Sequence, residues 1–149
     1  MKFTVIAVGK LKERFWTDAC AEYVKRLRPY APTRIVELAD SSPEREESAI
    51  LKAIEGAGER ARIVLLAIDG KQRGSEDLSH HLDDLALHGT SEVVFVIGGS
   101  DGVTAAIRER ADETLSFGPI TLPHNLARVV LLEQLYRAQK ISRGEPYHK

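Results

Sequence analysis

One short stretch of the sequence has the spacing of a serine nucleophile. The G-x-S-x-G pattern of hydrolases is matched by Gly98-Gly99-Ser100-Asp101-Gly102, which follows an apolar run as a nucleophile elbow follows a strand. Asp112 with His124 or His148 comes later, in the order of a catalytic triad. The alternative is a glycine turn at the carboxyl end of a parallel strand, where backbone groups approach a ligand. We favour the turn over an acyl-transfer role for Ser100, because no second oxyanion-hole motif is visible and five-residue matches arise easily by chance.

A second candidate is the loop Phe117–His124, which carries no charge before its final histidine. The loop holds two prolines and one glycine, so it is stiff and apolar where an exposed loop is normally polar. A slit lined by such a loop suits a flat apolar group, whose edge the backbone N–H and C=O groups would read. The alternative is a loop that packs into the core or against a second subunit.

The remaining candidate groups indicate no metal site. His81 and Asp84 are three residues apart on a predicted helix, but a third ligand is lacking, so a solvated helix face is the better interpretation. Cys20 is the single cysteine, which excludes an intramolecular disulfide and a cysteine metal cluster. Glu133 and Arg137 are spaced as an ordinary helix ion pair.

These stretches belong to a chain whose pattern alternates strand and helix. Apolar, β-rich runs predict strands at residues 3–8, 34–38, 62–68, 93–97 and 113–117. Periodic segments predict helices at residues 10–28, 43–57, 103–111 and 125–141, and one of about 14 residues capped by Ser75. Ser42 is the expected N-cap of the second helix. Continuous apolar strands separated by helices indicate a mostly parallel sheet with helices on both faces, in a single α/β domain over residues 1–149.

The last predicted helix differs from an ordinary surface helix. Residues 129–132 are apolar around a full turn, so we expect the helix to be buried on a second face, by another subunit or by its own chain. The tail Gly144–Lys149 follows it. Gly144 allows the chain to turn and Pro146 stiffens it, so we interpret the tail as an arm that reaches across a dimer interface.

Charge is unevenly distributed along the chain. The formal net charge of −1 argues against a general polyanion binder. Residues 1–34, however, carry eight Lys and Arg against three Asp and Glu, and residues 124–149 carry five against two. If the two ends meet, they form a basic patch that suits a phosphate backbone; the alternative is a scattered, solvated surface. The apolar runs are too short to span a bilayer and no signal-peptide layout is present, so we expect a cytoplasmic protein.

Four stretches together resemble the RlmH family of the SPOUT superfamily. They are Phe3–Trp16, Ile68–Glu76, Phe95–Gly102 and Thr121–Lys149, and the resemblance runs from end to end of the chain. Members of this family methylate N3 of a pseudouridine in 23S ribosomal RNA. The resemblance therefore implies a homodimeric methyltransferase that takes its methyl group from S-adenosylmethionine (SAM) and acts on the 70S ribosome. It also implies that the C-terminal part of the sheet is threaded as a trefoil knot.

The resemblance also implies which residues bind SAM. They form two strand ends and the apolar loop, namely Leu66, Gly98, Phe117, Gly118, Pro119, Ile120, Thr121 and Leu122. Relatives often carry Ser-x-Met-Thr where this chain has Gly118-Pro119-Ile120-Thr121. A serine side-chain contact is thereby lost at position 118, and we expect backbone contacts to the adenine to remain.

The implied reaction needs a base and a cation. The acceptor N3–H is a poor nucleophile until its proton leaves, and we expect His148 or His124 to accept that proton. Arg128 or Arg143 would hold RNA phosphate or the resulting anion. Tyr147 would stack on the base or hydrogen-bond to it. An alternative role for His124 is to fix the loop at the start of the last helix, and an alternative for the whole chain is a non-catalytic module that binds RNA or the ribosome.

Overall fold

Five parallel strands form one sheet in the computed structural model, which describes all residues 1–149. The strands are β1 (Lys2–Val8), β2 (Thr33–Leu38), β3 (Ala61–Gln72), β4 (Glu92–Ile97) and β5 (Glu113–Ser116). Their spatial order is β2-β1-β4-β3-β5, and all four neighbouring pairs are parallel. The prediction of a parallel sheet is therefore confirmed.

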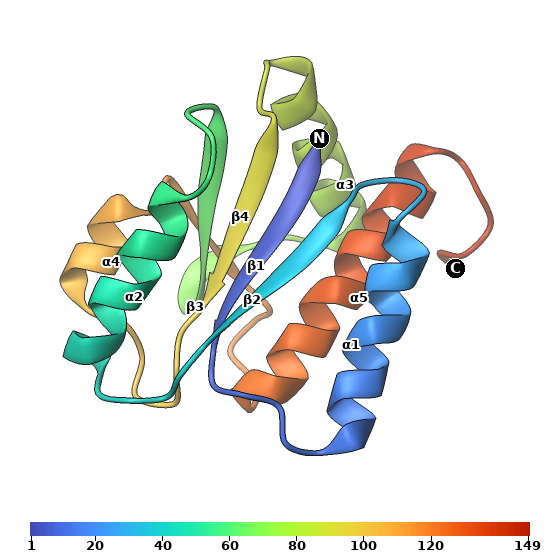
Figure 1. Cartoon of the computed structure of the whole chain (residues 1–149). Coiled ribbons are helices and arrows are strands. Elements are labelled where there is room, and N and C mark those ends of the chain that lie inside the picture. The colour runs from blue at the N-terminus through green and yellow to red at the C-terminus, as the bar shows by residue number, and fades with distance from the viewer.

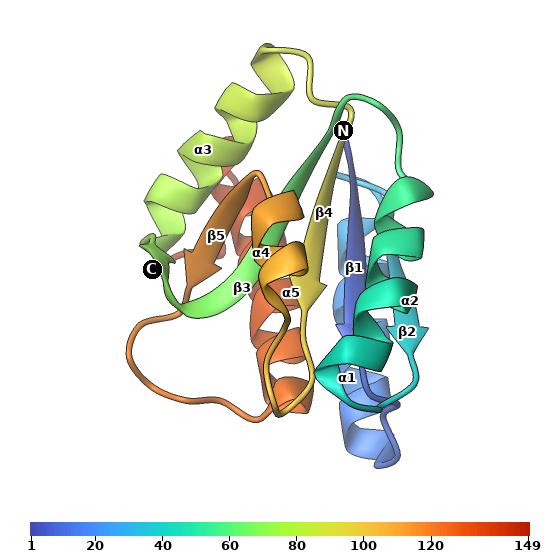
Figure 2. The ribbon, with the colours of Figure 1, turned by 90° about the vertical axis from the view of Figure 1, so that its left-hand side faces the viewer.

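Helices cover both faces of this sheet (Figures 1 and 2). The helices are α1 (Arg14–Leu27), α2 (Pro43–Glu55), α3 (Ser75–Leu87), α4 (Ala105–Arg110) and α5 (His124–Ser142). One apolar cluster joins α1, α3 and α5 to the sheet, and a second cluster joins α2 and α4 to the other face. The fold is thus an α/β/α sandwich, as the alternation of apolar strands and helices predicts.

The central strands are buried on both faces because their residues are apolar in continuous runs. Neighbouring residues of β1 point to opposite clusters: Val5 packs with α1 and α5, and Ile6 packs with α2. Every residue of β4 is buried. The outer strand β2 is only half-buried, so the core is centred on β1 and β4.

Three boundaries differ from the sequence prediction, each because of a distant partner. The first helix begins at Arg14 rather than near residue 10, because Gly9 turns the chain with φ +100° and the N–H of Leu11 donates to Glu37 instead of to a helix. Ser75 is the first helical residue rather than the cap, and its hydroxyl donates to Gln134 on α5. Strand β3 is longer than predicted and shifts register against β5 between Leu66 and Lys71. The predicted cap at Ser42 is confirmed by its bond from the Arg45 N–H.

Two helices on one face carry the ends of the chain. α1 and α5 lie side by side and run in the same direction, from the carboxyl edge of the sheet to the opposite edge (Figure 1). Gly144, with φ +65°, allows the turn that its residue type predicts, but the tail folds back onto α5 of its own chain instead of extending away as an arm. No helix is both long enough and apolar enough to cross a membrane.

Candidate functional site

The principal cavity opens at the carboxyl edge of the sheet, between β3 and β4. The connections that leave these strands go to opposite faces of the sheet, to α3 and to α4 (Figure 2). Ligands bind at such points of divergence in parallel α/β sheets. The cavity has a volume of about 760 Å³ and half of its lining residues are hydrophobic. Its walls are the middle of β3 (residues 66–69), where the register against β5 shifts, the turn after β4 (residues 97–103) and the loop after β5 (residues 117–124). The structure thus brings all the predicted SAM residues except Pro119 together around one cavity.

Glycines keep the cavity open at two points. A Cβ atom on Gly98 would lie 2.6 Å from Cγ1 of Val103, so a larger residue would displace the turn. Gly118 has φ +98°, a conformation that side chains with a Cβ rarely adopt. The turn after β4 is therefore a tightly packed glycine turn. That its backbone approaches a ligand stays a prediction.

The apolar loop offers unpaired backbone donors to the cavity. The N–H groups of Ile120, Thr121 and Leu122 make no hydrogen bond within the chain. The base of the loop is fixed by the buried Ser116, whose hydroxyl donates to the Ile68 carbonyl at 2.7 Å and accepts from the Gly118 N–H at 3.0 Å. Sequence reasoning missed Ser116, since a serine at the end of a strand shows no local pattern that identifies this bridge.

The cavity fits the nucleoside part of SAM. Its volume lies within the usual range of small-molecule sites, its walls are largely apolar, and its free N–H groups can read the edge of an adenine. Asp69 and Arg108 also line it and form an exposed ion pair with an Nη1–Oδ1 distance of 3.4 Å.

The structure contradicts a serine nucleophile at Ser100. A nucleophile elbow holds its serine in a strained turn directly before a helix, but no residue other than glycine has a positive φ, and α4 begins only at Ala105. Ser100 is exposed, and no histidine is hydrogen-bonded to it. The hydrolase interpretation is therefore wrong.

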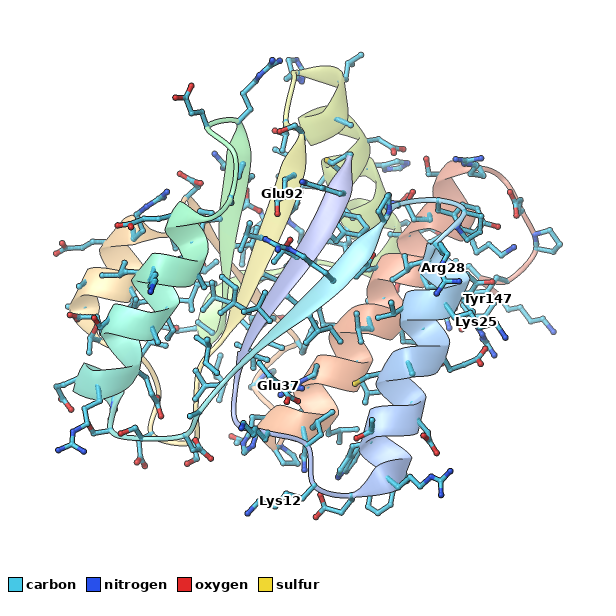
Figure 3. The ribbon with its side chains drawn as sticks, in the orientation of Figure 1. Lys12, Lys25, Arg28, Glu37, Glu92 and Tyr147 are labelled. Carbon is cyan, nitrogen blue, oxygen red and sulfur yellow. The ribbon has the colours of Figure 1, made fainter.

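His124 and Arg128 lie one turn apart at the start of α5 and have different surroundings. His124 lines the cavity, and its Nε2 would lie 3.0 Å from a Cβ placed on Gly9. Arg128 is 1% exposed; its guanidinium donates to Glu37 at 2.6 Å and to the Gly9 carbonyl at 2.8 Å. Arg128 thus has neither the exposure nor the free charge that the predicted contact with RNA or an anion needs. It locks the start of α5 to β1 and β2, where Figure 3 shows Glu37 beside α5.

The contact with Arg128 lowers the pKa of the Glu37 carboxyl group. Burial alone would raise the pKa of its carboxyl group, but the hydrogen bonds from Arg128 and from the Leu11 N–H outweigh burial and lower the pKa. The carboxylate is therefore charged at neutral pH and holds both the guanidinium and the loop after β1.

The tail residues lie against α5 of their own chain, not in the cavity. The Tyr147 hydroxyl donates to Glu133 at 2.9 Å, and Arg137 lies over the Tyr147 ring at 4.7 Å. Burial and the bond to Glu133 raise the pKa of Tyr147 to about 12, so the phenol is a donor at neutral pH. His148 Nδ1 lies 3.1 Å from Arg137 Nη1, and His148 Nε2 lies 3.6 Å from Glu76.

Arg143 also lies outside the cavity of its own chain. It is exposed at the end of α5, with its guanidinium 5.1 Å from the Tyr30 ring centre. Of the predicted catalytic residues, only His124 lines that cavity. His81 does not lie on the fully solvated helix face that the sequence favours, since its side chain is only 20% exposed and lies 2.7 Å from Glu113.

Comparison with known proteins identifies the family. The profile of the predicted SPOUT methyltransferases matches residues 1–148. A protein of Bifidobacterium adolescentis named ribosomal RNA large subunit methyltransferase H is 50% identical over 159 aligned residues, which cover the whole of both chains. Proteins of the same name from Bacillus thuringiensis and Bacillus anthracis are 46% identical, again over the whole of each chain. The chain therefore belongs to the SPOUT methyltransferases, and within them to the family of ribosomal RNA large subunit methyltransferase H.

Proposed function

We propose that this protein transfers a methyl group from SAM to N3 of a pseudouridine in 23S ribosomal RNA, with the assembled 70S ribosome as its substrate. The full-length similarity to methyltransferases named for the large-subunit RNA carries this proposal. The shape and the donors of the cavity support it, because they suit a nucleoside-bearing cofactor. The activity places the protein in the cytoplasm, where ribosomes work.

The cavity residues bind and orient the donor. Leu66 of β3 and Gly98 of the turn after β4 line the cavity, and the loop Phe117–Leu122 turns its free N–H groups toward the adenine edge. Bound SAM supplies an electrophilic methyl group on its sulfonium. Because the transfer is an in-line displacement, the rigid base of the loop at Ser116 contributes by positioning.

The acceptor side is supplied by the histidines and the tail. His148 or His124 accepts the proton of N3, and Arg143 stabilises the resulting anion or holds an adjacent phosphate. Tyr147, which remains protonated at neutral pH, donates to the base or stacks on it. Glu133 and Arg137 hold the two tail residues in place.

A second copy of the chain brings the two sides together. The tail residues lie away from the cavity of their own chain, so a single chain cannot present them to its own donor. Leu126 and Val130 lie one turn apart on α5, half-buried and outside the two apolar clusters of the core. We place the homodimer contact on this side of α5, so that the tail of one subunit serves the cavity of the other.

Family membership also supports a trefoil knot in the C-terminal part of the fold. The chain that leaves β5 returns through the apolar loop to α5 on the opposite side of the sheet from α4 (Figure 2). Tracing of the chain through this region in an experimental structure tests the knot.

Methyl transfer to ribosomes that lack the modification tests the function and the role of the tail together. Deletion of residues 146–149 should abolish transfer of labelled methyl groups, while sedimentation still shows a dimer and equilibrium dialysis still shows SAM binding. His148→Ala should lower kcat about a hundredfold or more if it is the base. His80→Ala changes an exposed histidine without a partner and serves as the control.

Three outcomes contradict parts of the proposal. Full activity of the truncated chain would remove the tail from the site. Equal rates on isolated 23S RNA and on 70S particles would exclude the assembled ribosome as the required substrate. Absence of SAM binding at high micromolar concentration would favour a non-catalytic RNA-binding module.

A further inference from the structure

All four tyrosines of the chain gather at one end of the molecule, away from the cavity. Tyr136 on α5 lies at their centre, with its ring 6.4 Å from Tyr23, 6.1 Å from Tyr30 and 4.9 Å from Tyr147. These residues come from the C-terminal half of α1, the turn after it, α5 and the tail. The aromatic cluster therefore links two regions that are far apart in the sequence, residues 23–30 and residues 136–147.

Cations are interleaved with these rings. Arg26 lies 5.3 Å from the Tyr23 ring centre, and Arg143 lies 5.1 Å from that of Tyr30. Some of the positive charge here is neutralised within the chain, since Arg26 pairs with Glu22 and Lys140 pairs with Glu145. These ion pairs within the chain account for the positions of Arg26 and Lys140, so neither cation requires a partner from another molecule.

Three cations at this end of the molecule form no ion pair with an acidic side chain. They are exposed residues at the ends of α1 and α5, which we call the basic cluster: Lys25, Arg28 and Arg143. Figure 3 labels Lys25 and Arg28 on the last turns of α1, and the ends of α1 and α5 lie side by side, with Arg143 against the Tyr30 ring in the turn after α1. A cation in the last turn also stabilises its own helix, so position alone does not identify a ligand. In a chain of net charge −1, however, three unpaired cations at adjoining helix ends are a local concentration of positive charge.

We propose that the basic cluster binds the phosphate backbone of the ribosomal RNA that flanks the target nucleotide. The inference rests on the proposed function and extends it to α1, which carries none of the proposed donor-site or catalytic residues. Guanidinium groups match phosphate geometry, and tyrosine faces between cations suit nucleotides better than acidic side chains of a protein.

The position of the basic cluster relative to the tail supports the same partner. Tyr147 comes four residues after Arg143. Its ring packs 4.9 Å from Tyr136, which in turn lies 6.4 Å from Tyr23 of α1. An RNA held by these cations would therefore be held next to Tyr147 and His148, the two tail residues that must reach its base. Because the rest of a protein with net charge −1 repels RNA, docking depends on such a local patch.

Neutral substitutions on α1 test the docking surface without touching the proposed catalytic residues. Lys25→Gln with Arg28→Gln should weaken binding to 70S ribosomes about tenfold and lower the slope of log K against log salt by about 2. KM for ribosomes should rise while kcat and SAM binding stay unchanged. Arg45→Gln with Lys52→Gln removes the same charge from exposed positions on α2, on the other face of the sheet, and should have no such effect.

Binding to isolated 23S RNA at low salt separates RNA from a protein partner. Binding of the double variant to this RNA should fall in the same proportion as its binding to ribosomes. Weakened binding to ribosomes alone would indicate an acidic ribosomal protein and overturn the proposal, as would equal effects of the two double variants. A wild-type protein that binds ribosomes with the expected salt dependence but transfers no methyl group would contradict the proposed function and leave the docking surface intact.

Discussion

Arg128 shows how a single buried side chain positions the candidate site. Its guanidinium holds the Gly9 carbonyl at the end of β1 and the Glu37 carboxylate on β2, while its own helix begins with His124 at the cavity. Removal of the cation would leave a carboxylate and a buried carbonyl without their partner. The primary effect of a substitution should therefore fall on folding stability.

Replacement of Arg128 by Met should lower the free energy of unfolding by about 2–4 kcal/mol, as measured by urea denaturation. The exposed Arg45 on α2 provides the matched control, and Arg45→Met should change stability by less than about 0.5 kcal/mol. If Arg128→Met instead leaves stability unchanged and lowers only kcat, the side chain acts directly on the substrate, as the sequence alone suggests.

At the scale of elements, one of the contacts that attach the tail to α5 is the bond from Tyr147 to the Glu133 carboxylate. Burial alone would raise the pKa of Glu133, but hydrogen bonds from Arg137 and Tyr147 outweigh burial and lower it below its ordinary value of 4.5. A carboxyl group whose pKa is lower in the folded than in the unfolded chain stabilises the fold fully above the unfolded pKa. That stabilisation disappears as the pH falls through the folded pKa.

Glu133→Gln should therefore destabilise the protein at pH 7, and the difference from wild type should shrink as the pH falls below 4.5. Urea denaturation at several pH values measures this difference. Glu109→Gln changes an exposed carboxylate on α4 without a hydrogen bond or ion pair, so its difference from wild type should stay near zero. A constant difference for Glu133→Gln would mean that the carboxylate does not hold the tail through its charge.

Local sequence signals predicted the elements well and their ends less well. Apolar runs identify all five strands, because the central strands are buried and the half-buried β2 still packs its apolar residues against the two clusters. The start of α1 was misplaced because it depends on the bond from Leu11 to Glu37, which lies 26 residues away. The role of Ser75 was misplaced for the same reason, since Gln134 competes for its hydroxyl. A sequence pattern reflects local conformational preference, so it does not show hydrogen bonds between residues that are distant in the sequence.

For the candidate site, residues that act through the backbone were easier to predict than residues that act through side chains. The glycines of the turn after β4, and the glycine and prolines of the loop after β5, can be recognised in the sequence because these residue types have special backbone conformations. Arg128 looks available in the sequence because its partners come from β1 and β2, and Ser116 gives no signal at all. The resemblance of the whole chain to one family supplied the cofactor and the reaction, which no residue pattern contains.

At the scale of the whole molecule, α5 separates the cavity at its first residue from the tail at its last. This separation determines how an active centre can be assembled. The helix has 19 residues, so about 28 Å separate His124 at the cavity from the turn that starts the tail. In the proposed dimer each active centre therefore takes its donor half from one polypeptide and its acceptor half from the other. Two variants that each lack a different half of the active centre should then restore activity when they form mixed dimers.

Gly98→Val damages only the donor half and deletion of residues 146–149 damages only the acceptor half, so each homodimer should be inactive. After equal amounts of the two are unfolded and refolded together, about half of the dimers are mixed and each contains one intact centre, giving about a quarter of the wild-type activity. Two proteins that both carry Gly98→Val should recover nothing. Such intersubunit rescue can arise only if the length of α5 keeps the two halves of a centre on separate chains.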